Sequence, residues 1–198
     1  MIVMRIEICG GIASGKTTLT HAIDKITTFH GVYEDFLTNT FLDDFYSNPD
    51  IYCYETEMSF LLQHMHQIKK KMQYTSGLVC DFSCEQDFAY AQNNLSARAM
   101  KSFQLMYDEV YREISQPDVI IFLKCPFHVL KDRITVRNRK NEQDIGILYL
   151  EKTVRQLEQR ISITDIPVIE IDSHYWDFRE QSEVYDVLTL YLKDILLL

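Results

Sequence analysis

The glycine-rich stretch at residues 9–18, CGGIASGKTT, constrains this chain more than any other feature. It places Gly10, Gly15, Lys16 and Thr17 at the spacing G-x-x-x-x-G-K-T. Glycines at both ends let the backbone curl so that several N–H groups point at a phosphate chain, while the lysine adds charge and the threonine hydroxyl can bind magnesium. An apolar, β-rich run precedes the stretch and a helical pattern follows it, so the helix N-terminus adds partial positive charge at the phosphates. We therefore predict a site for a nucleoside triphosphate. The residues expected to surround its phosphates are Gly10, Gly11, Ile12, Ala13, Ser14, Gly15, Lys16, Thr17 and Thr18.

Apolar runs and helical patterns alternate along the rest of the chain. Strands are expected at residues 1–9, 31–33, 77–80, 119–123 and 167–171. Helices are expected at residues 17–29, 51–74, 100–114, 148–161 and 184–197, and from residue 127 onward. Strands that alternate with helices indicate a parallel sheet. We predict an α/β fold in which residues 1–198 form a single domain around a doubly wound, five-stranded parallel sheet.

Composition limits the partners of the chain. A net charge of −9 argues against nucleic acid as a general partner, because binding a polyanion depends on clustered Lys and Arg. The first apolar run is too short for a signal peptide or a transmembrane span, so we expect no membrane partner. Five cysteines without paired C-x-x-C spacing indicate neither a zinc site nor a disulfide framework. We expect a cytoplasmic protein that binds a small ligand.

Two acids follow predicted strands. In parallel α/β sheets, ligands bind outside the carboxyl ends of the strands, which is where Glu34 and Asp81 would lie. Taken alone, Glu34 is more simply a solvated surface acid. Asp81, beside the phosphate loop, is the expected second anchor for Mg²⁺ together with Thr17.

Residues 133–142 form a basic run, RITVRNRKNE. Such runs are usually solvated helix faces, but a dense group of arginines is informative in an acidic chain. Phosphoryl transfer builds negative charge on the migrating group, and cations from a closing segment can contribute about 10³ to 10⁵ in rate. We assign Arg137 and Arg139 to the phosphates, with Arg133 beside them.

Several segments together resemble the deoxynucleoside kinase family, especially bacterial members that act on deoxyadenosine and deoxyguanosine. They are GGIASGKTTL, the acid after the second strand, FLDDFYSNPD, the helical segment EMSFL and the pattern R-I-x-x-R-x-R-x-x-E. The resemblance covers nearly the whole chain. It implies a P-loop kinase fold with an arginine-rich lid at about residues 133–146. It also implies ATP-dependent 5′-phosphorylation of deoxynucleosides in nucleotide salvage, with Mg²⁺, and a homodimer formed through long helices.

The resemblance also assigns roles to individual residues. Those expected to bind the nucleoside are Glu34, Tyr46, Glu57, Asp87 and Glu142. Glu34 would accept the 5′-hydroxyl proton, with Asp81 as the competing candidate for the base. Tyr46 and Glu142 would contact the 3′-hydroxyl, and residues 57 and 87 the nucleobase. Lys16 and Arg137 would complete the catalytic group. Alternatively, Asp87 is an acid near a helix N-terminus that the helix dipole stabilises.

Two positions depart from the family pattern. Phe82 stands where the family has Arg, and Glu57 stands where it usually has Gln. Two other functions therefore stay open. A nucleoside monophosphate kinase shares the phosphate loop and the basic lid, but its acceptor normally needs an arginine, and Phe82 argues against it. A nonenzymatic nucleotide-binding relative would fit both departures.

Glu57 and Asp87 would put two acids into the nucleobase pocket. Both cannot ionise cheaply at close range, so one should hold its proton or face a ligand rich in donors. Guanine presents its N1–H and 2-amino group side by side, and one carboxylate can accept both, whereas adenine presents its 6-amino group. Thymine presents carbonyl oxygens there. We expect deoxyguanosine or deoxyadenosine to be preferred over thymidine, with deoxyguanosine favoured.

Overall fold

The computed structural model describes residues 3–139, 146–187 and 190. At its centre lies a five-stranded sheet with the strand order β2-β3-β1-β4-β5, and all neighbouring strands are parallel. The strands are β1 (Met4–Gly10), β2 (His30–Val32), β3 (Gly77–Cys80), β4 (Val119–Lys124) and β5 (Val168–Asp172). The predicted α/β fold with five parallel strands is confirmed, and each strand lies close to its predicted place.

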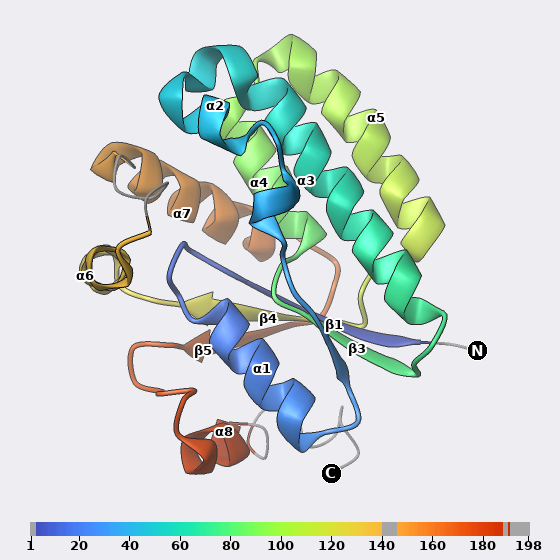
Figure 1. Cartoon of the computed structure of the whole chain (residues 1–198), viewed down its shortest axis with the longest axis vertical. Coiled ribbons are helices and arrows are strands. Elements are labelled where there is room, and N and C mark those ends of the chain that lie inside the picture. The colour runs from blue at the N-terminus through green and yellow to red at the C-terminus, as the bar shows by residue number, and fades with distance from the viewer. Residues whose placement is uncertain (1–2, 140–145, 188–189, 191–198) are drawn as a thin grey trace.

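Helices cover both faces of this sheet. The α-helices within the described residues are α1 (Lys16–Ile26), α2 (Leu42–Ser47), α3 (Pro49–Met72), α4 (Cys84–Asn94), α5 (Ala97–Ile114), α6 (Phe127–Arg137), α7 (Ile147–Ser162) and α8 (Gln181–Val187). A short 3₁₀ helix, η1 (Phe36–Thr38), follows β2. Helices α1 and α8 lie on one face, whereas α3, α4, α5 and α7 lie on the other (Figure 1). None of these helices, as far as the structure describes them, is long and apolar enough to span a membrane.

Most of the predicted helices are found, and two further helices are present. Helices α1, α3, α5 and α7 correspond to predicted ones, and α6 begins at the predicted residue. Helix α2 was not predicted, and a helix at the place of α4 was considered only in the alternative reading of Asp87, which does lie in the first turn of α4. Most of the predicted helix at residues 184–197 lies outside the described residues, as do residues 140–145 of the predicted lid.

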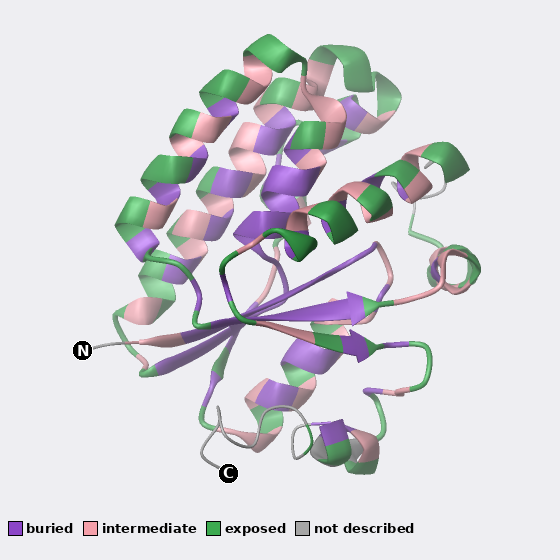
Figure 2. Cartoon of the chain, turned by 180° about the vertical axis from the view of Figure 1, so that it is seen from behind, coloured by how far each residue is buried: buried purple, intermediate pink, exposed green. Residues whose placement is uncertain are grey.

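The apolar side chains form a core on each side of the sheet. On one side, Ile8 of β1 packs with Leu19 and Ile23 of α1. On the other, β3 packs against α3 and α5 through residues such as Leu61 and Phe103. Strands β1, β3 and β4 are therefore mostly buried, whereas the edge strand β5 and the outer surfaces of the helices are partly exposed (Figure 2). Because helices cover both faces, ligand binding is left to the carboxyl edge of the sheet.

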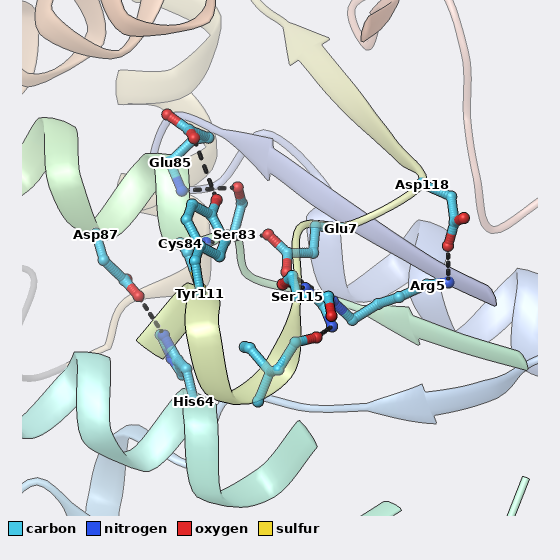
Figure 3. A network of polar contacts seen from close by, with 11 residues as sticks. Arg5, Glu7, His64, Ser83, Cys84, Glu85, Asp87, Tyr111, Ser115 and Asp118 are labelled. Carbon is cyan, nitrogen blue, oxygen red and sulfur yellow. Dashed lines mark hydrogen bonds and ion pairs between the residues drawn. The ribbon is translucent and has the colours of Figure 1, made fainter. Parts of the chain in front are cut away.

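β1 is unusual because it buries two charges inside the sheet. Arg5 Nε lies 3.0 Å from Glu7 Oε1, and both side chains are almost fully buried. Arg5 also donates to the Ile114 carbonyl at 2.7 Å, while Glu7 accepts the Cys84 amide at 3.1 Å. A buried ion pair is tolerated only when further hydrogen bonds satisfy it. Here those bonds tie β1 to the end of α5 and the start of α4, and Figure 3 shows this network.

Candidate active site

The phosphate loop connects β1 to α1 and depends on its glycines. Gly10 and Gly15 have φ angles of 156° and 103°, which side chains with a Cβ rarely adopt. A Cβ on Gly10 would also lie 2.6 Å from Ser14 Oγ. The loop therefore keeps a tight curl that ends at the N-terminus of α1, where its unpaired N–H groups favour anions.

Lys16 is folded across this loop. Its Nζ donates to the carbonyl oxygens of Gly10 at 3.0 Å and Gly11 at 3.3 Å. Burial lowers the pKa of Lys16, although the carboxylates of Glu34 and Asp81 act in the opposite direction. The amine thus lies between the phosphate loop and the two acids. In this position it can bind a phosphate group held by the loop.

Asp81 follows β3 and lies next to both Thr17 and Glu34. Its Oδ1 accepts the Glu34 amide at 2.6 Å, which joins the ends of β2 and β3. Burial raises the pKa of Asp81, and hydrogen bonds from the Glu34 amide and the Thr17 hydroxyl oppose that rise. Among the described residues, no group of three or more His, Cys, Asp or Glu could hold a metal by itself. A hydroxyl and one carboxylate nevertheless fit Mg²⁺, which usually completes its shell with water and phosphate oxygens.

Glu34 lies beside a histidine that the sequence analysis did not single out. Its Oε1 is 3.4 Å from Nε2 of His64, and the opposite nitrogen of that ring, Nδ1, is 2.8 Å from Oδ2 of Asp87. His64 and Asp87 face each other across α3 and α4 (Figure 3). Burial acts to raise the pKa of Glu34, but His64, Lys16 and Arg139 outweigh it and the pKa is lowered. Glu34 is therefore ionised at neutral pH, as a base must be.

Glu57 reaches the cleft from α3 in a different electrostatic setting. Asn94 Nδ2 donates to Glu57 Oε1 at 2.6 Å and to the Tyr149 hydroxyl at 3.1 Å. Burial, reinforced by Asp87 and opposed by Asn94, raises the pKa of Glu57 to about 8. Glu57 is then a neutral carboxylic acid at neutral pH, with one donor and one acceptor. This agrees with the expectation that one of the two acids holds its proton.

The arginines approach the cleft from α6. That helix ends at Asn138, whose left-handed backbone (φ 49°) turns the chain, and Arg139 then stacks over the Phe36 ring with its Cζ 4.9 Å from the centroid. Arg137 lines the cleft directly. Arg133 instead donates to the carbonyls of Ser14, at 3.4 Å, and Ser173, at 2.8 Å, so it braces the phosphate loop.

These parts surround one cleft of about 990 Å³. The predicted residues that line it are Ile12, Ala13, Ser14, Gly15, Lys16, Thr17, Thr18, Glu34, Tyr46, Glu57, Asp81, Asp87, Arg137 and Arg139. Gly10 and Gly11 lie at the start of the loop and bind Lys16. Glu142 lies outside the described residues. The structure thus brings the described candidates together at the carboxyl edge of the sheet.

Several polar residues of this region were not predicted from the sequence. Among them are His64, Asn94 and Gln86, whose Oε1 accepts the Gly10 amide at 3.1 Å. His64 is seven residues after Glu57, and Asn94 is seven after Asp87. Because seven residues make about two helical turns, these pairs lie on the same face of α3 and of α4. Helical spacing from the two predicted acids could therefore have found His64 and Asn94.

Comparisons with known proteins agree with this geometry. The chain is 24% identical to deoxyguanosine kinase of Bacillus subtilis over 200 residues, covering 96% of this chain and 97% of that protein. It is 27% identical to deoxyadenosine kinase of Dictyostelium discoideum over 174 residues, covering 84% and 71% of the two chains.

The fold is shared with solved structures of the same kind. The structure of deoxyadenosine kinase from M. mycoides with bound dCTP superposes with a TM-score of 0.81 at 20% identity, covering 97% of this chain and 100% of that one. The model of the deoxynucleoside kinase family matches residues 6–196, which is nearly the whole sequence. The chain therefore belongs to the deoxynucleoside kinase family and is a kinase.

Proposed function

We propose that the protein transfers the γ-phosphoryl group of ATP to the 5′-hydroxyl of a purine deoxynucleoside. The observation that supports this most directly is the position of Glu34. It is an ionised acid that shares a cleft with Lys16 and the phosphate loop and is joined to Asp81 through its own amide. A hydroxyl held by Glu34 would therefore face the last phosphate of a triphosphate held by the loop.

Each part of the cleft then has a chemical task. Glu34 accepts the proton of the 5′-hydroxyl as that oxygen attacks phosphorus. Lys16, Arg137 and Arg139 neutralise the charge that develops on the transferring group. Thr17 and Asp81 would hold Mg²⁺, which supplies further charge neutralisation when bound. Tyr46, on the cleft wall, is assigned to the 3′-hydroxyl, and Glu142 remains assigned to it by resemblance.

The nucleobase pocket favours a purine. The two relatives described above are named for deoxyguanosine and deoxyadenosine. A neutral Glu57 offers one donor and one acceptor, which complement the N1 and 6-amino group of adenine. An ionised Glu57 offers two acceptors, which complement the N1–H and 2-amino group of guanine. Deoxyguanosine, which the sequence favours, therefore fits the ionised form of Glu57, and deoxyadenosine fits the neutral form.

We also place this reaction in the cytoplasm. All five cysteine thiols are free, as suits a reducing compartment. ATP would be the phosphate donor there.

A coupled assay of ADP release tests the proposal. Deoxyadenosine, deoxyguanosine, thymidine and dAMP are each supplied with ATP and Mg²⁺. We expect turnover with both purine deoxynucleosides, less with thymidine and none with dAMP. Turnover with dAMP alone would instead identify a nucleoside monophosphate kinase.

The role of Glu34 is tested by Glu34→Gln. We expect kcat to fall by about 10² to 10⁴, with a smaller change in the KM of the nucleoside, because the amide cannot accept the proton. The matched control is Asp35→Asn, which alters the adjacent, exposed acid. A fall in kcat below tenfold for Glu34→Gln would move the role of base to Asp81.

A further inference from the structure

His64 is almost completely enclosed within the protein, although it is a polar side chain. Its side chain is 1% exposed, and the ring lies between two carboxylates that come from different parts of the chain. Glu34 comes from the segment after β2, and Asp87 comes from α4. One side chain of α3 therefore links the acid assigned to the 5′-hydroxyl with an acid assigned to the nucleobase.

The position of its two nitrogens between two carboxylates favours a charged ring. Nδ1 is 2.8 Å from Asp87 Oδ2, and Nε2 is 3.4 Å from Glu34 Oε1. A neutral imidazole carries one N–H, so only the imidazolium presents a proton to both carboxylates. Burial acts to lower the pKa of His64, but the Asp87 and Glu34 carboxylates outweigh it and raise the pKa to about 10.

The plane of this ring is fixed by aromatic neighbours. Phe82, which is fully buried, stacks on His64 with a centroid separation of 3.8 Å and an interplanar angle of 6°. Phe60 packs against the ring at 5.9 Å. Phe82 is the residue that follows Asp81 at the end of β3, where it contributes no charge. Its ring instead provides the flat surface on which the His64 ring of α3 stacks.

We propose that His64 is a positioning residue of this site, holding Glu34 toward the sugar and Asp87 toward the nucleobase, with Phe82 fixing the plane of its ring. The proposal rests on the function proposed above. It gives the apolar residue beside Asp81 a structural role in the site. It also implies that the sugar and nucleobase ends of the pocket are coupled through one ring.

The contact with Glu34 has room to tighten. The Nε2–Oε1 distance is that of an ion pair, and Nε2 forms no hydrogen bond within the described part of the chain. The Glu34 side chain is 32% exposed, so it is free to move on the cleft side. A buried donor without a partner is unfavourable. A nucleoside that presses Glu34 toward Nε2 would satisfy that donor, so binding would favour the aligned base.

Kinetics of His64→Gln test the proposal, with His66→Gln as the matched control on the exposed face of the same helix. We expect kcat to fall by about 10² and the KM of the nucleoside to rise, because small misplacements of a catalytic group have effects of this size. The KM of ATP should change less than twofold. A purely structural role would lower the melting temperature and leave kcat per folded molecule unchanged. Values of kcat and nucleoside KM within twofold of the wild type would overturn the proposal.

A double variant separates positioning from folding. His64→Ala with Phe82→Arg removes the imidazolium and offers a guanidinium from the other side of the same space. We expect it to recover at least tenfold of the kcat lost by His64→Ala alone. No recovery in a protein that folds and binds ATP would count against the proposal.

A last measurement is independent of turnover. The titratable groups that face His64 are Glu34 and Asp87, and we expect ¹⁵N NMR to show both ring nitrogens protonated at pH 8. Asp87→Asn should return the ring to the neutral form at that pH. If the ring is charged but the wild type phosphorylates no deoxynucleoside, the proposed function is wrong, while the positioning of Glu34 and Asp87 by His64 is supported. If the enzyme is active but the ring is neutral at pH 8, the positioning role of His64 is wrong, while the proposed function is supported.

Discussion

Lys16 and Glu57 show how neighbouring groups decide what a side chain can do. Lys16 contacts two loop carbonyls and faces two acids, so its amine is held where a phosphate would lie. Glu57 is buried near Asp87, and within the described part of the chain its carboxyl group accepts a hydrogen bond from the Asn94 amide, so burial favours its neutral form. Both residues line the same cleft, Lys16 next to the phosphate loop and Glu57 next to the expected nucleobase position.

Lys16→Ala should abolish measurable turnover and leave the fold intact. The substitution removes the cation nearest the phosphates, whereas Lys16 is not part of the apolar core. Activity and thermal unfolding are measured together, with Lys25→Ala on the exposed end of α1 as the control. Retained turnover would exclude Lys16 from phosphate binding.

The base preference should change with pH because of Glu57. Below its pKa of about 8 the acid is neutral and complements adenine, and above it the carboxylate complements guanine. The ratio of kcat/KM for deoxyguanosine to that for deoxyadenosine should therefore rise as pH increases through 8. In Glu57→Gln the ratio should not vary with pH, whereas Glu55→Gln should behave as the wild type. A constant ratio in the wild type would contradict this account of the pocket.

At this scale the sequence could predict residues whose position follows from a strand end. Asp81 directly follows β3 and Glu34 lies two residues after β2, so the rule for parallel sheets places both at the ligand-binding edge. His64 could not be chosen in this way, because its environment depends on the approach of β2 and α4 to α3. The turn that carries Arg139 over Phe36 likewise depends on the left-handed backbone of Asn138.

Helix α4 is the element on which the nucleobase side depends. It carries Gln86, Asp87 and Tyr90 into the cleft, and it begins at Ser83, whose side chain accepts the Glu85 amide at 3.2 Å. Helix α5 begins in the same way at Ser96 but contributes no residue to the cleft. The chain thus contains two comparable N-caps with different relations to the site.

Replacing each cap by alanine separates stability from activity. Ser83→Ala and Ser96→Ala should each lower the free energy of unfolding by about 0.5–2 kcal/mol, the usual effect of losing a serine N-cap. Urea unfolding checks this. Only Ser83→Ala should raise the nucleoside KM, because it loosens the first turn of α4. Equal kinetic effects would show that α4 does not set the pocket.

The extent of α4 could not be predicted from the sequence for a physical reason. Residues 84–89 are all buried, including Glu85, Gln86 and Asp87, so the first half of the helix has no polar, solvated face. An amphipathic period is the main sequence signal of a helix, and it is absent from this half. Glu85 is satisfied by Tyr107, Tyr111 and Arg160, none of which is near it in sequence. The strands lacked this difficulty, because buried parallel strands are recognisable as continuous apolar runs.

The whole molecule presents apolar side chains on the two long helices. Leu62 of α3 is 39% exposed and Leu105 of α5 is 73% exposed, and the two helices lie side by side (Figure 1). Exposed leucines on these two helices are compatible with the homodimer that the family resemblance implies, which is formed through long helices.

We predict a dimer, with sedimentation giving twice the mass of one chain. Leu62→Glu with Leu105→Glu should yield monomers, because charges on both helices would be buried at the interface. Leu148→Glu, on the exposed face of α7, is the control. A monomeric mass for the wild type at micromolar concentration would contradict the prediction of a dimer.

β2, the strand that leads to Glu34, is a three-residue edge strand that pairs only with β3. Edge segments with few backbone bonds open locally at much lower free energy than the core does. Glu34, which we propose as the catalytic base, therefore follows a strand with few backbone bonds, whereas the phosphate loop follows the central strand β1. Occupancy of the nucleoside pocket should then slow amide hydrogen exchange around Glu34 more than exchange in β1. We expect local opening to be confined to the nucleoside side of the cleft, with the phosphate side remaining rigid.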